Sequence, residues 1–370
     1  MATNSRKKRA AAGVTAHDVA RVLGVSQSTI SRAFTVSASI SRETKARVME
    51  AATALGYQPN IIARSLITRR SNIVAIVMAN LVDPFYPVVL DELTQQIQAR
   101  GRQILLFVPS PPQDVDDILP TLLQYQVDAI VITSATVSSA MARACAARKT
   151  PVVLLNRYVP GLEIHAVSCD NVAAGRTVAD FLADRGHARP AFVAGLPGAS
   201  TNLDRQRGFL ARLGERGVGP CLQEEGGDYT FEAGFTATRR LLRQREHPDA
   251  IFYASDIMAV GGMEALREAS LRVPHDVSVI GFDDVPLAAW PSHGLTTVRQ
   301  PVKDMVAAAI EVVGLDNVPP IMRAPTTRLI RGELVERSST MDRNGVGAGG
   351  RTRAASAAKR ATQRRARRKT

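Results

Sequence analysis

The sequence has few cysteines and no long apolar stretch. Cys145, Cys169 and Cys221 lie far apart, with no CxxC pair and no histidine at ligand spacing, so neither a disulfide framework nor a zinc site is indicated. No run of 18 or more apolar residues offers a membrane span, and the short alanine run at 10–12 is too brief for a signal-peptide core. These absences predict a protein of the reducing cytoplasm without a membrane partner.

A recognisable catalytic constellation is also missing. The six histidines are scattered without a nucleophile motif beside them, and the sequence has no Walker loop and no metal-ligand spacing. Gly261 and Gly262 open no phosphate loop, and we expect them to pack a helix against its sheet. The adjacent Asp283 and Asp284 are interpreted as structural or ligand-binding, because neighbours in a strand-end loop normally point apart. We therefore expect no catalytic residue, no metal and no cofactor.

Positive charge is distributed unevenly along the chain. The formal net charge is +13, and the two tails account for it, with +4 in residues 1–10 and +9 in residues 341–370. Between the tails, residues 11–70 carry +5 and residues 71–340 carry −5. A basic front segment joined to a mildly acidic body fits nucleic-acid binding at one end and an ordinary folded module behind it.

The segment 14–59 is predicted to form three short helices around one small core. Its apolar side chains recur at helical spacing: Val19, Leu23, Val25, Ile30, Phe34, Ile40, Val48, Ala52 and Leu55. The predicted boundary signals are a capping box at Thr15 and Asp18, a break at Gly24, caps at Ser26 and Ser41, and a stop at Pro59 and Asn60.

The second of these helices is rich in side chains that suit base edges. Gln27, Ser28 and Arg32 can reach outward near its N-terminal half, where a major-groove helix contacts bases. Three hydroxyls are short enough to bond phosphate oxygens, namely Ser26, Thr29 and Ser31. The spacing alone also fits a generic three-helix scaffold with a solvated polar face.

From residue 73 the sequence alternates short apolar runs with amphipathic stretches. The apolar runs suit strands buried on both faces and lie at 73–79, 104–108, 129–133, 152–155, 191–194, 251–254 and 277–282. Covering helices are predicted over 91–100, 172–185 and 256–268. About 265 residues of this pattern exceed one sheet, which predicts an α/β core of two doubly wound lobes. The segment 338–370 has almost nothing to bury and is predicted to be a basic disordered tail.

Further motifs follow the helix pair: Ser41-Arg-Glu-Thr, Ala54-Leu-Gly-Tyr-Gln-Pro-Asn and Ala63-Arg-Ser-Leu. With them, roughly residues 14–337 resemble the lactose-repressor (LacI/GalR) family. The resemblance implies a basic tail at 1–13, a helix-turn-helix DNA-binding domain at 14–59, a hinge helix and linker at 60–71, and a periplasmic-binding-protein-like effector domain at 72–337.

The resemblance also implies which residues contact DNA. In the family the second helix enters the major groove, and the hinge orders when two subunits sit on DNA. The hinge leucine, which Leu66 matches, then wedges into the minor groove, and Ala63 is small enough for two hinge helices to approach. The alternative for Leu66 is a linker residue that packs on the core. The expected DNA contacts are Thr15, Ser26, Gln27, Ser28, Thr29, Ser31, Arg32, Asn60, Ala63 and Leu66.

A second set of residues matches the family's effector contacts, at the carboxyl ends of the predicted strands. The matching residues are Phe85, Tyr86, Asn156, Arg205, Tyr229, Ser255 and Asp283. Their carboxylate, guanidinium and amide groups suit sugar hydroxyls, and the aromatic faces suit ring C–H groups. Phe85 could equally belong to the core of a lobe. Arg205 is expected to open the helix that contains it, and Asp256 is expected to cap the helix it precedes rather than touch ligand.

Two charged residues are added to this set because of their place. Asp170 lies where the chain is expected to cross first between the lobes. Arg157 follows Asn156, at a variable place where the family often has an aspartate. A second arginine could suit an anionic ligand such as a sugar acid or sugar phosphate, or it could pair with Glu163 or Asp170. The sequence leaves these alternatives open.

A ligand-responsive transcription regulator explains these features better than an exported sugar-binding protein or an enzyme. An exported protein needs a signal peptide and has no use for residues 14–68, and an enzyme needs a catalytic site. We expect a homodimer, with a tetramer left open, that binds a palindromic operator in double-stranded DNA. Ligand-induced release, the commoner family pattern, makes the chain a repressor, although the sequence does not decide between release and recruitment. The C-terminal tail either adds phosphate contacts or is merely solvated.

Overall fold

The computed structural model describes residues 14–34, 39–58, 71–78, 80–109, 115–133, 143, 145, 147, 150–315 and 325–344. The chain divides into two compact units, Met1–Asn72 and Ile73–Thr370. Three predicted DNA contacts, Asn60, Ala63 and Leu66, lie outside the described residues, as do the tails at 1–13 and 345–370. No helix in the described ranges is long and apolar enough to cross a membrane.

The first unit contains the three predicted helices, α2 (Ala16–Leu23), α3 (Gln27–Ala33) and α4 (Arg42–Leu55). The capping box is confirmed, because the Thr15 hydroxyl accepts from the N–H of Asp18 while the Asp18 carboxylate accepts from the N–H of Thr15 at 3.1 Å. Gly24 ends α2 in the left-handed conformation, at φ 65°. Ser26 and Ser41 cap the next two helices, as predicted.

The end of α4 differs from the prediction. Gly56, at φ 67°, terminates the helix directly after Leu55, and its N–H bonds back to the carbonyls of Ala52 and Thr53. The expected stop at Pro59 and Asn60 was therefore wrong by one helical turn, because the left-handed glycine ends the helix first. The apolar residues of the three helices form one core, with Val19, Ile30 and Val48 fully buried at its centre.

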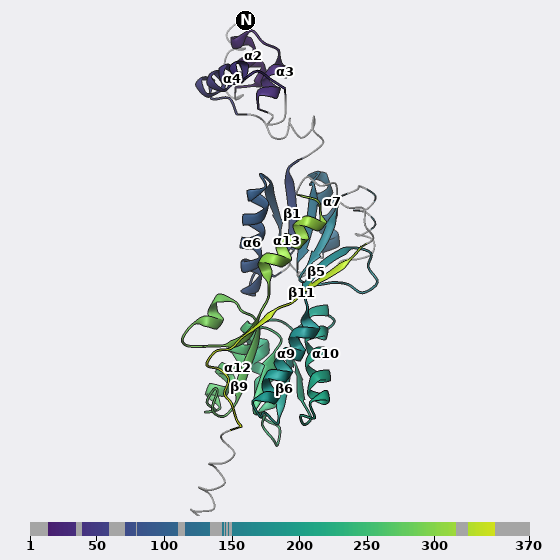
Figure 1. Cartoon of the computed structure of the whole chain (residues 1–370), viewed down its shortest axis with the longest axis vertical. Helices are drawn as coiled ribbons and strands as arrows, with labels where there is room; N and C mark the ends of the chain where they lie inside the picture. The colour runs from purple at the N-terminus through teal and green to yellow at the C-terminus, as the bar shows by residue number, and fades with distance from the viewer. Residues whose placement is uncertain are drawn as a thin grey trace, which may run out of the picture. The chain divides into compact units, whose positions relative to one another are not determined.

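The second unit has two lobes, each built on a six-stranded sheet (Figure 1). The first lobe has the strand order β11-β5-β4-β3-β1-β2, and its paired strands are parallel. Its described elements are β1 (Ile73–Met78), α6 (Phe85–Ala99), β2 (Gln103–Phe107), α7 (Val115–Gln124), β3 (Ala129–Thr133), β4 (Val152–Leu155), β5 (His165–Cys169), α13 (Val302–Val312) and β11 (Thr327–Ile330).

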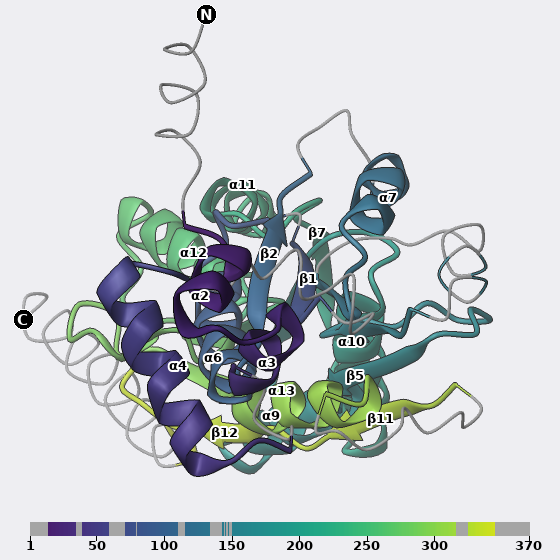
Figure 2. The same ribbon diagram turned by 90° about the horizontal axis from the view of Figure 1, so that it is seen from above.

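The β1 strand shows how the first sheet is covered on both faces. Val74, Ile76 and Met78 point into the core beneath α6, whereas the alternate residues Ala75 and Val77 join a separate core that includes Leu122 of α7. In Figure 2, α7 lies on the opposite side of β1 and β2 from α6 and α13. A strand buried on both faces needs a continuous apolar run, which explains why β1 was easy to predict.

The second lobe has the strand order β12-β10-β9-β8-β6-β7, and only the β10–β12 pair is antiparallel among these described strands. Its elements are α9 (Asn171–Asp184), β6 (Pro190–Ala194), α10 (Ser200–Glu215), β7 (Leu222–Glu225), α11 (Phe231–Leu241), β8 (Ala250–Tyr253), α12 (Asp256–Glu268), β9 (Ser278–Asp283), a 3-10 turn at Pro286–Ala289, β10 (Thr296–Arg299) and β12 (Glu333–Val335).

The chain crosses between the lobes three times. It passes from β5 to α9, returns from β10 to α13, and leaves again from β11 to β12, so α13 appears green beside the blue α6 in Figure 1. The crossings lie side by side at Gly332, where an added Cβ would stand 2.9 Å from the carbonyl oxygen of Arg299 and 3.1 Å from the sulfur of Cys169. The connection between the lobes is therefore narrow and closely packed.

Glycines allow the helices of the second lobe to pack in two close pairs. An added Cβ at Gly208 of α10 would lie 2.1 Å from the carbonyl oxygen of Val172 in α9. At Gly261 of α12 it would lie 2.0 Å from the carbonyl oxygen of Phe231 in α11, and at Gly262 it would meet the Tyr253 hydroxyl of β8. The expectation that Gly261 and Gly262 pack a helix on its sheet is thus correct for Gly262, whereas Gly261 faces a helix.

The ordered chain extends beyond the predicted boundary at residue 337. Ser339 is buried, and its hydroxyl donates to the carbonyl of Val279 at 2.6 Å. The N–H of Arg343 donates to the carbonyl of Arg185 at 2.8 Å. The prediction of disorder from 338 onward was therefore wrong for residues 338–344, because their backbone and small polar side chains bond to the second lobe without needing an apolar run.

Candidate functional site

The first candidate site is the outer face of α3. Gln27, Ser28, Ser31 and Arg32 are all exposed, whereas Ile30 and Ala33 on the opposite face are buried in the core. The helix therefore presents a polar face with one guanidinium and one amide, the groups that read guanine and adenine in a major groove.

The hydroxyl groups of the three-helix unit that are predicted to contact DNA have hydrogen-bond partners within the unit. Ser26 caps α3, and its hydroxyl lies 2.7 Å from that of Ser28 and 2.9 Å from that of Thr29. Thr15 is engaged in the capping box of α2. These hydroxyls hold the helix ends in place, and exposed hydroxyls of this kind retain a lone pair or a rotatable proton for a phosphate.

The second candidate site is a polar cavity between the two lobes. Its lining comes from the carboxyl ends of strands and the first turns of helices in both lobes. The lining residues are Asp83, Phe85, Tyr86, Asn156, Arg157, Thr201, Arg205, Tyr229 and Asp283. Seven of the nine predicted effector residues thus line one cavity, the exceptions being Asp170 and Ser255.

Arg205 forms a fixed part of the cavity wall. Its Nε donates to Oδ1 of Asn171 at 2.8 Å, and Nη1 donates to the carbonyl oxygen of Ala254. Its Nη2 stands 3.8 Å from Oδ1 of Asp283, and the guanidinium lies 3.6 Å above the ring of Phe282. Arg205 does not open its helix as expected, because α10 begins at Ser200 and places Arg205 in the second turn.

Two buried carboxyl groups line the cavity together with this arginine. Burial raises the pKa of Asp283 well above that of an exposed aspartate, although the Arg205 guanidinium opposes the shift. Its Oδ1 accepts from Nε2 of Gln300 at 2.7 Å. Burial likewise raises the pKa of Asp83 to about 6, against the effect of the Phe85 N–H that its Oδ1 accepts at 3.0 Å. The sequence prediction missed Asp83, although it directly precedes Pro-Phe-Tyr after the first strand.

Aromatic side chains supply the apolar part of the wall. Phe85 and Tyr86 are in edge contact, with ring centroids 5.4 Å apart, and both are buried. Phe85 belongs to the core of the lobe and also lines the cavity, so both alternatives drawn from the sequence apply. The Tyr229 hydroxyl lies 3.1 Å from that of Thr201, a second lining residue that the sequence prediction missed.

Asn156 and Arg157 lie directly after β4, and each has a buried polar atom without a hydrogen-bond partner. Asn156 has a positive φ of 75°, and its Oδ1 is buried without a hydrogen-bond partner. Arg157 is only 9% exposed, and its Nε also lacks a partner. The structure gives Arg157 no ion pair with Glu163 or Asp170 in the described part of the chain.

Three other residues that the sequence singled out do not line the cavity. Asp170 caps α9 by accepting from the N–H of Ala173 at 3.0 Å, so its carboxylate is engaged at the helix start and not in the cavity. Ser255 is buried at the start of α12 without forming a cap. Asp256 is not a cap either, because its carboxylate accepts from the N–H of Val285 and the hydroxyl of Thr297.

The lobes are closed over the polar cavity. The Tyr158 hydroxyl in the β4–β5 loop donates to Oδ2 of Asp204 in α10 at 2.8 Å, and the Tyr158 N–H donates to the Ser200 hydroxyl at 3.1 Å. The remaining volume is about 10 Å³, room for no more than a single water molecule. A ligand as large as a sugar therefore requires the lobes to separate before it can enter.

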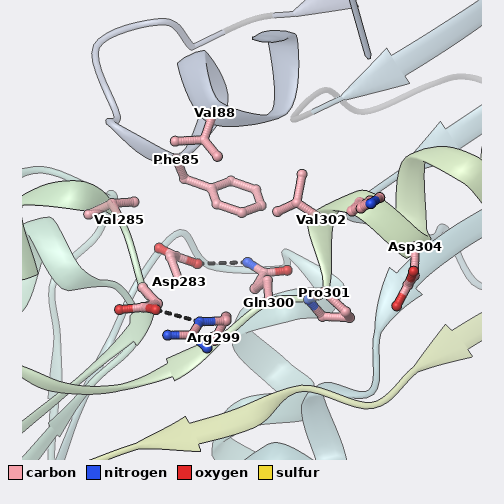
Figure 3. A pocket seen from close by; sticks show the side chains of 11 residues that line it. Phe85, Val88, Asp283, Val285, Arg299, Gln300, Pro301, Val302 and Asp304 are labelled. Atoms are coloured by element: carbon pink, nitrogen blue, oxygen red, sulfur yellow. Dashed lines mark hydrogen bonds and ion pairs between the residues drawn. The ribbon is translucent and has the colours of Figure 1, made fainter. Parts of the chain in front are cut away.

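A wider pocket of about 360 Å³ adjoins the cavity and shares Phe85 and Asp283 with it. Figure 3 shows Phe85 beside Val302 at the centre of the pocket, with the hydrogen-bonded pair of Asp283 and Gln300 beneath them. The Oε1 atom of Gln300 is buried without a partner. Polar and apolar surfaces thus meet in a pocket of the size of a small-molecule site.

Both units match known protein families. Residues 15–60 match the model of "Bacterial regulatory proteins, lacI family", and residues 179–340 match a periplasmic binding protein-like domain. The chain is 30% identical over 328 residues to the HTH-type transcriptional regulator GalS of Salmonella typhimurium, covering 88% of this chain and 96% of that protein. The chain belongs to the LacI family. The ribose operon repressor of Escherichia coli is 31% identical over 303 residues, with 81% and 92% covered.

Solved structures of the LacI family agree in fold. The lac repressor dimer bound to operator superposes with a TM-score of 0.80 at 24% identity, covering 89% of this chain and all of that one. The CelR–cellobiose complex superposes with a TM-score of 0.64 at 26% identity, covering 88% and 99%. The protein is a DNA-binding transcriptional regulator with an effector-binding core, and not an enzyme. No cluster of metal-ligating side chains occurs within the described residues.

Proposed function

We propose that this regulator represses transcription by binding a palindromic operator through α3, and that a carbohydrate-derived effector held between the lobes controls this binding. The observation that carries the proposal is the pairing of an exposed recognition face with a polar interlobe cavity in one LacI-family chain. Gln27, Ser28 and Arg32 would contact base edges, while Thr15, Ser26, Thr29 and Ser31 would contact phosphates.

The proposed effector contacts are the cavity residues of both lobes. Phe85, Tyr86 and Asn156 come from the first lobe, and Arg205, Tyr229 and Asp283 come from the second. Because each lobe contributes polar groups, a ligand in the cavity would bond both lobes and favour their closure. The cellobiose complex of a relative supports a carbohydrate as the class of ligand.

Coupling between the sites would pass through residues 60–68. A change in lobe arrangement would alter the separation of two hinge segments, and with it the free energy of ordering them on DNA. In this proposal Asn60, Ala63 and Leu66 contact the minor groove only when the hinges are ordered. The dimeric lac repressor on its operator supports a homodimer for this chain, and sedimentation analysis would distinguish a dimer from a tetramer.

The proposal can be tested by selecting duplexes from a random pool with the full-length protein and titrating the enriched sequence by fluorescence anisotropy. A palindrome should be enriched. Gln27→Ala should weaken binding by about 1–3 kcal/mol, roughly 5- to 150-fold, because an amide can form a bidentate pair with adenine. It should also relax the preference at one base pair of each half-site.

A matched control is the same substitution at Gln98, which is exposed on α6 of the effector unit. Gln98→Ala should leave the operator affinity unchanged. Enrichment of no palindromic sequence, or equal affinities of the Gln27 variant and the parent, would contradict the proposed role of α3.

A further inference from the structure

Arg157 is a buried cation with no ion pair or hydrogen bond to any other residue that the structure describes. It lines the interlobe cavity, it is 9% exposed, and its Nε is buried without a hydrogen-bond acceptor. A guanidinium remains charged at any physiological pH, so burying it without an anion is unfavourable. Such an arrangement is expected where a ligand supplies the missing charge.

The internal anions near Arg157 are already used elsewhere or lie in the solvent. Asp170 accepts from the N–H of Ala173 at the start of α9, and Glu163 is exposed. Asp204 is paired with Arg207 at 2.8 Å and accepts from the Tyr158 hydroxyl. The charge of Arg157 helps to lower the pKa of Asp83, but Oδ1 of Asp83 accepts from the N–H of Phe85, and no ion pair joins Asp83 to Arg157 among the described residues.

The other arginine of the cavity contrasts with Arg157. Arg205 donates to Asn171 and to the carbonyl of Ala254, stacks on Phe282 and faces Asp283. Its charge is therefore compensated within the second lobe. Of the two guanidinium groups that line the cavity, only that of Arg157 has no hydrogen bond or ion pair in the described part of the chain.

The neighbouring groups define the rest of the ligand. The unpartnered Oδ1 of Asn156 and the carboxylates of Asp83 and Asp283 are acceptors that suit hydroxyl groups. The ring of Phe85 forms an apolar surface between the cavity and the adjoining pocket. A polyol with one anionic end would satisfy both kinds of group, whereas an uncharged sugar would leave Arg157 unpaired.

We propose that the effector is an anionic carbohydrate derivative, a sugar acid or a sugar phosphate, whose anionic group pairs with Arg157. This inference rests on the proposed function, because it names the ligand class of the same cavity. A carboxylate and a phosphate are both recognised by a planar guanidinium fork. A carboxylate ligand and a phosphate ligand are distinguished by comparing compounds derived from the same sugar.

The test uses the full-length protein and three matched sets of ligands at pH 7.5. The sets are galactose, galacturonate and galactose 6-phosphate; glucose, glucuronate and glucose 6-phosphate; and ribose, ribonate and ribose 5-phosphate. Thermal shift identifies binders, and calorimetry gives their Kd. In at least one set, a charged ligand should raise the Tm while the uncharged sugar of that set does not. If the sugar acid binds, the anionic group is a carboxylate, and if the sugar phosphate binds, it is a phosphate.

Variants connect this selectivity to Arg157. Arg157→Met should weaken binding of the charged ligand at least tenfold, and Arg157→Lys should retain part of the affinity. Because Arg157 forms no ion pair among the described residues, Arg157→Met should keep or raise the Tm of the ligand-free protein, whereas loss of a structural ion pair would lower it. Arg245→Met, on an exposed arginine of the second lobe, serves as the matched control and should change neither quantity.

Three results would overturn the inference: stabilisation by an uncharged sugar alone, an unchanged Kd in Arg157→Met, or no response to any charged ligand. The proposed function is measured separately by operator binding. An uncharged sugar that shifts operator affinity would therefore refute the anionic effector while leaving the regulatory function intact.

Discussion

At the scale of single residues, the interlobe cavity places two carboxylic acids where water is nearly excluded. Asp83 and Asp283 are both more than nine-tenths buried, and burial raises the pKa of each. The cavity keeps them because a carboxylate that is poorly solvated binds ligand hydroxyls strongly. Because both carboxyl groups are buried, their ionisation lowers the free energy of unfolding of the ligand-free protein.

The loss of stability on ionisation can be measured for Asp83. The pKa of its carboxyl group is raised in the folded protein to about 6 from an ordinary value of 3.8, so the folded state holds the proton more tightly than the unfolded state. The resulting stabilisation is fully present below pH 4 and is lost as the pH rises through 6. Relative to the parent, Asp83→Asn should therefore gain about 1 kcal/mol of unfolding free energy between pH 5 and pH 7.5.

Parallel urea titrations of the parent and Asp83→Asn at the two pH values give this difference. Groups with lowered pKa, such as Asp249, change the stability of both proteins in the opposite direction and cancel in the comparison. A difference between the two proteins that stays constant with pH would show that Asp83 ionises normally in the folded state.

The sequence predicted most of the cavity at the residue scale. Arg205, Asp283 and Asn156 were found because they directly follow strands or stand in a characteristic motif. Thr201 was missed because it lies in the first turn of α10, whose start five residues earlier than expected only the structure reveals. The absence of a partner for Arg157 could not be predicted, because it depends on how neighbouring carboxylates are oriented in space.

At the scale of elements, the contact between α9 and α10 determines where Arg205 stands. Gly208 lies one turn after Arg205, directly against the backbone of Val172. Gly208→Ala should push α10 away from α9, lowering stability by about 1–3 kcal/mol and weakening effector binding, because the added methyl group has no space. Thermal unfolding and calorimetry would measure both effects.

Gly214→Ala provides the control within the same helix. An added Cβ at Gly214 meets nothing within 4 Å, so the variant should keep or slightly raise the Tm, because alanine favours a helix over glycine. If Gly208→Ala proved as stable as Gly214→Ala, α10 would tolerate a methyl group at Gly208, and the close approach to α9 would not be what requires glycine there.

The predicted elements were those with a strong local pattern. The run at 129–133 is a strand as predicted, because each residue of β3 is buried. The edge strand β7, Leu-Gln-Glu-Glu, was missed because alternate residues are exposed, and β11 was missed for the same reason. The helix predicted over 91–100 begins six residues earlier, at Phe85, because Pro84 provides its start.

At the scale of the whole molecule, the described part of the chain ends at Asn344, where a strongly basic segment of the sequence begins. Residues 345–370 contain nine basic residues and no acidic residue. Removing them should make the salt dependence of non-specific DNA binding less steep, because each lost phosphate contact lowers the slope by about 0.9. Filter binding across a range of salt concentrations would measure the slope.

A cut four residues earlier, after Thr340, should behave differently. It would also remove the carbonyl of Met341 that meets His187 at 3.3 Å and the side chain of Arg343 that donates to Asp276 at 2.9 Å. This second truncation should lower the Tm, while the first should not. An unaltered salt slope in the first truncation would show that the tail is only solvated.

The three crossings between the lobes have a consequence for biosynthesis. The first lobe receives α13 and β11 only after most of the second lobe has been made, and the second lobe receives β12 and the segment around Ser339 last of all. Neither lobe is therefore a contiguous stretch of the chain. A ribosome must reach the final strands before either sheet is complete, whereas the three-helix headpiece can fold as it emerges. A premature stop codon before β11 would thus leave a folded three-helix DNA-binding unit attached to two unfinished lobes.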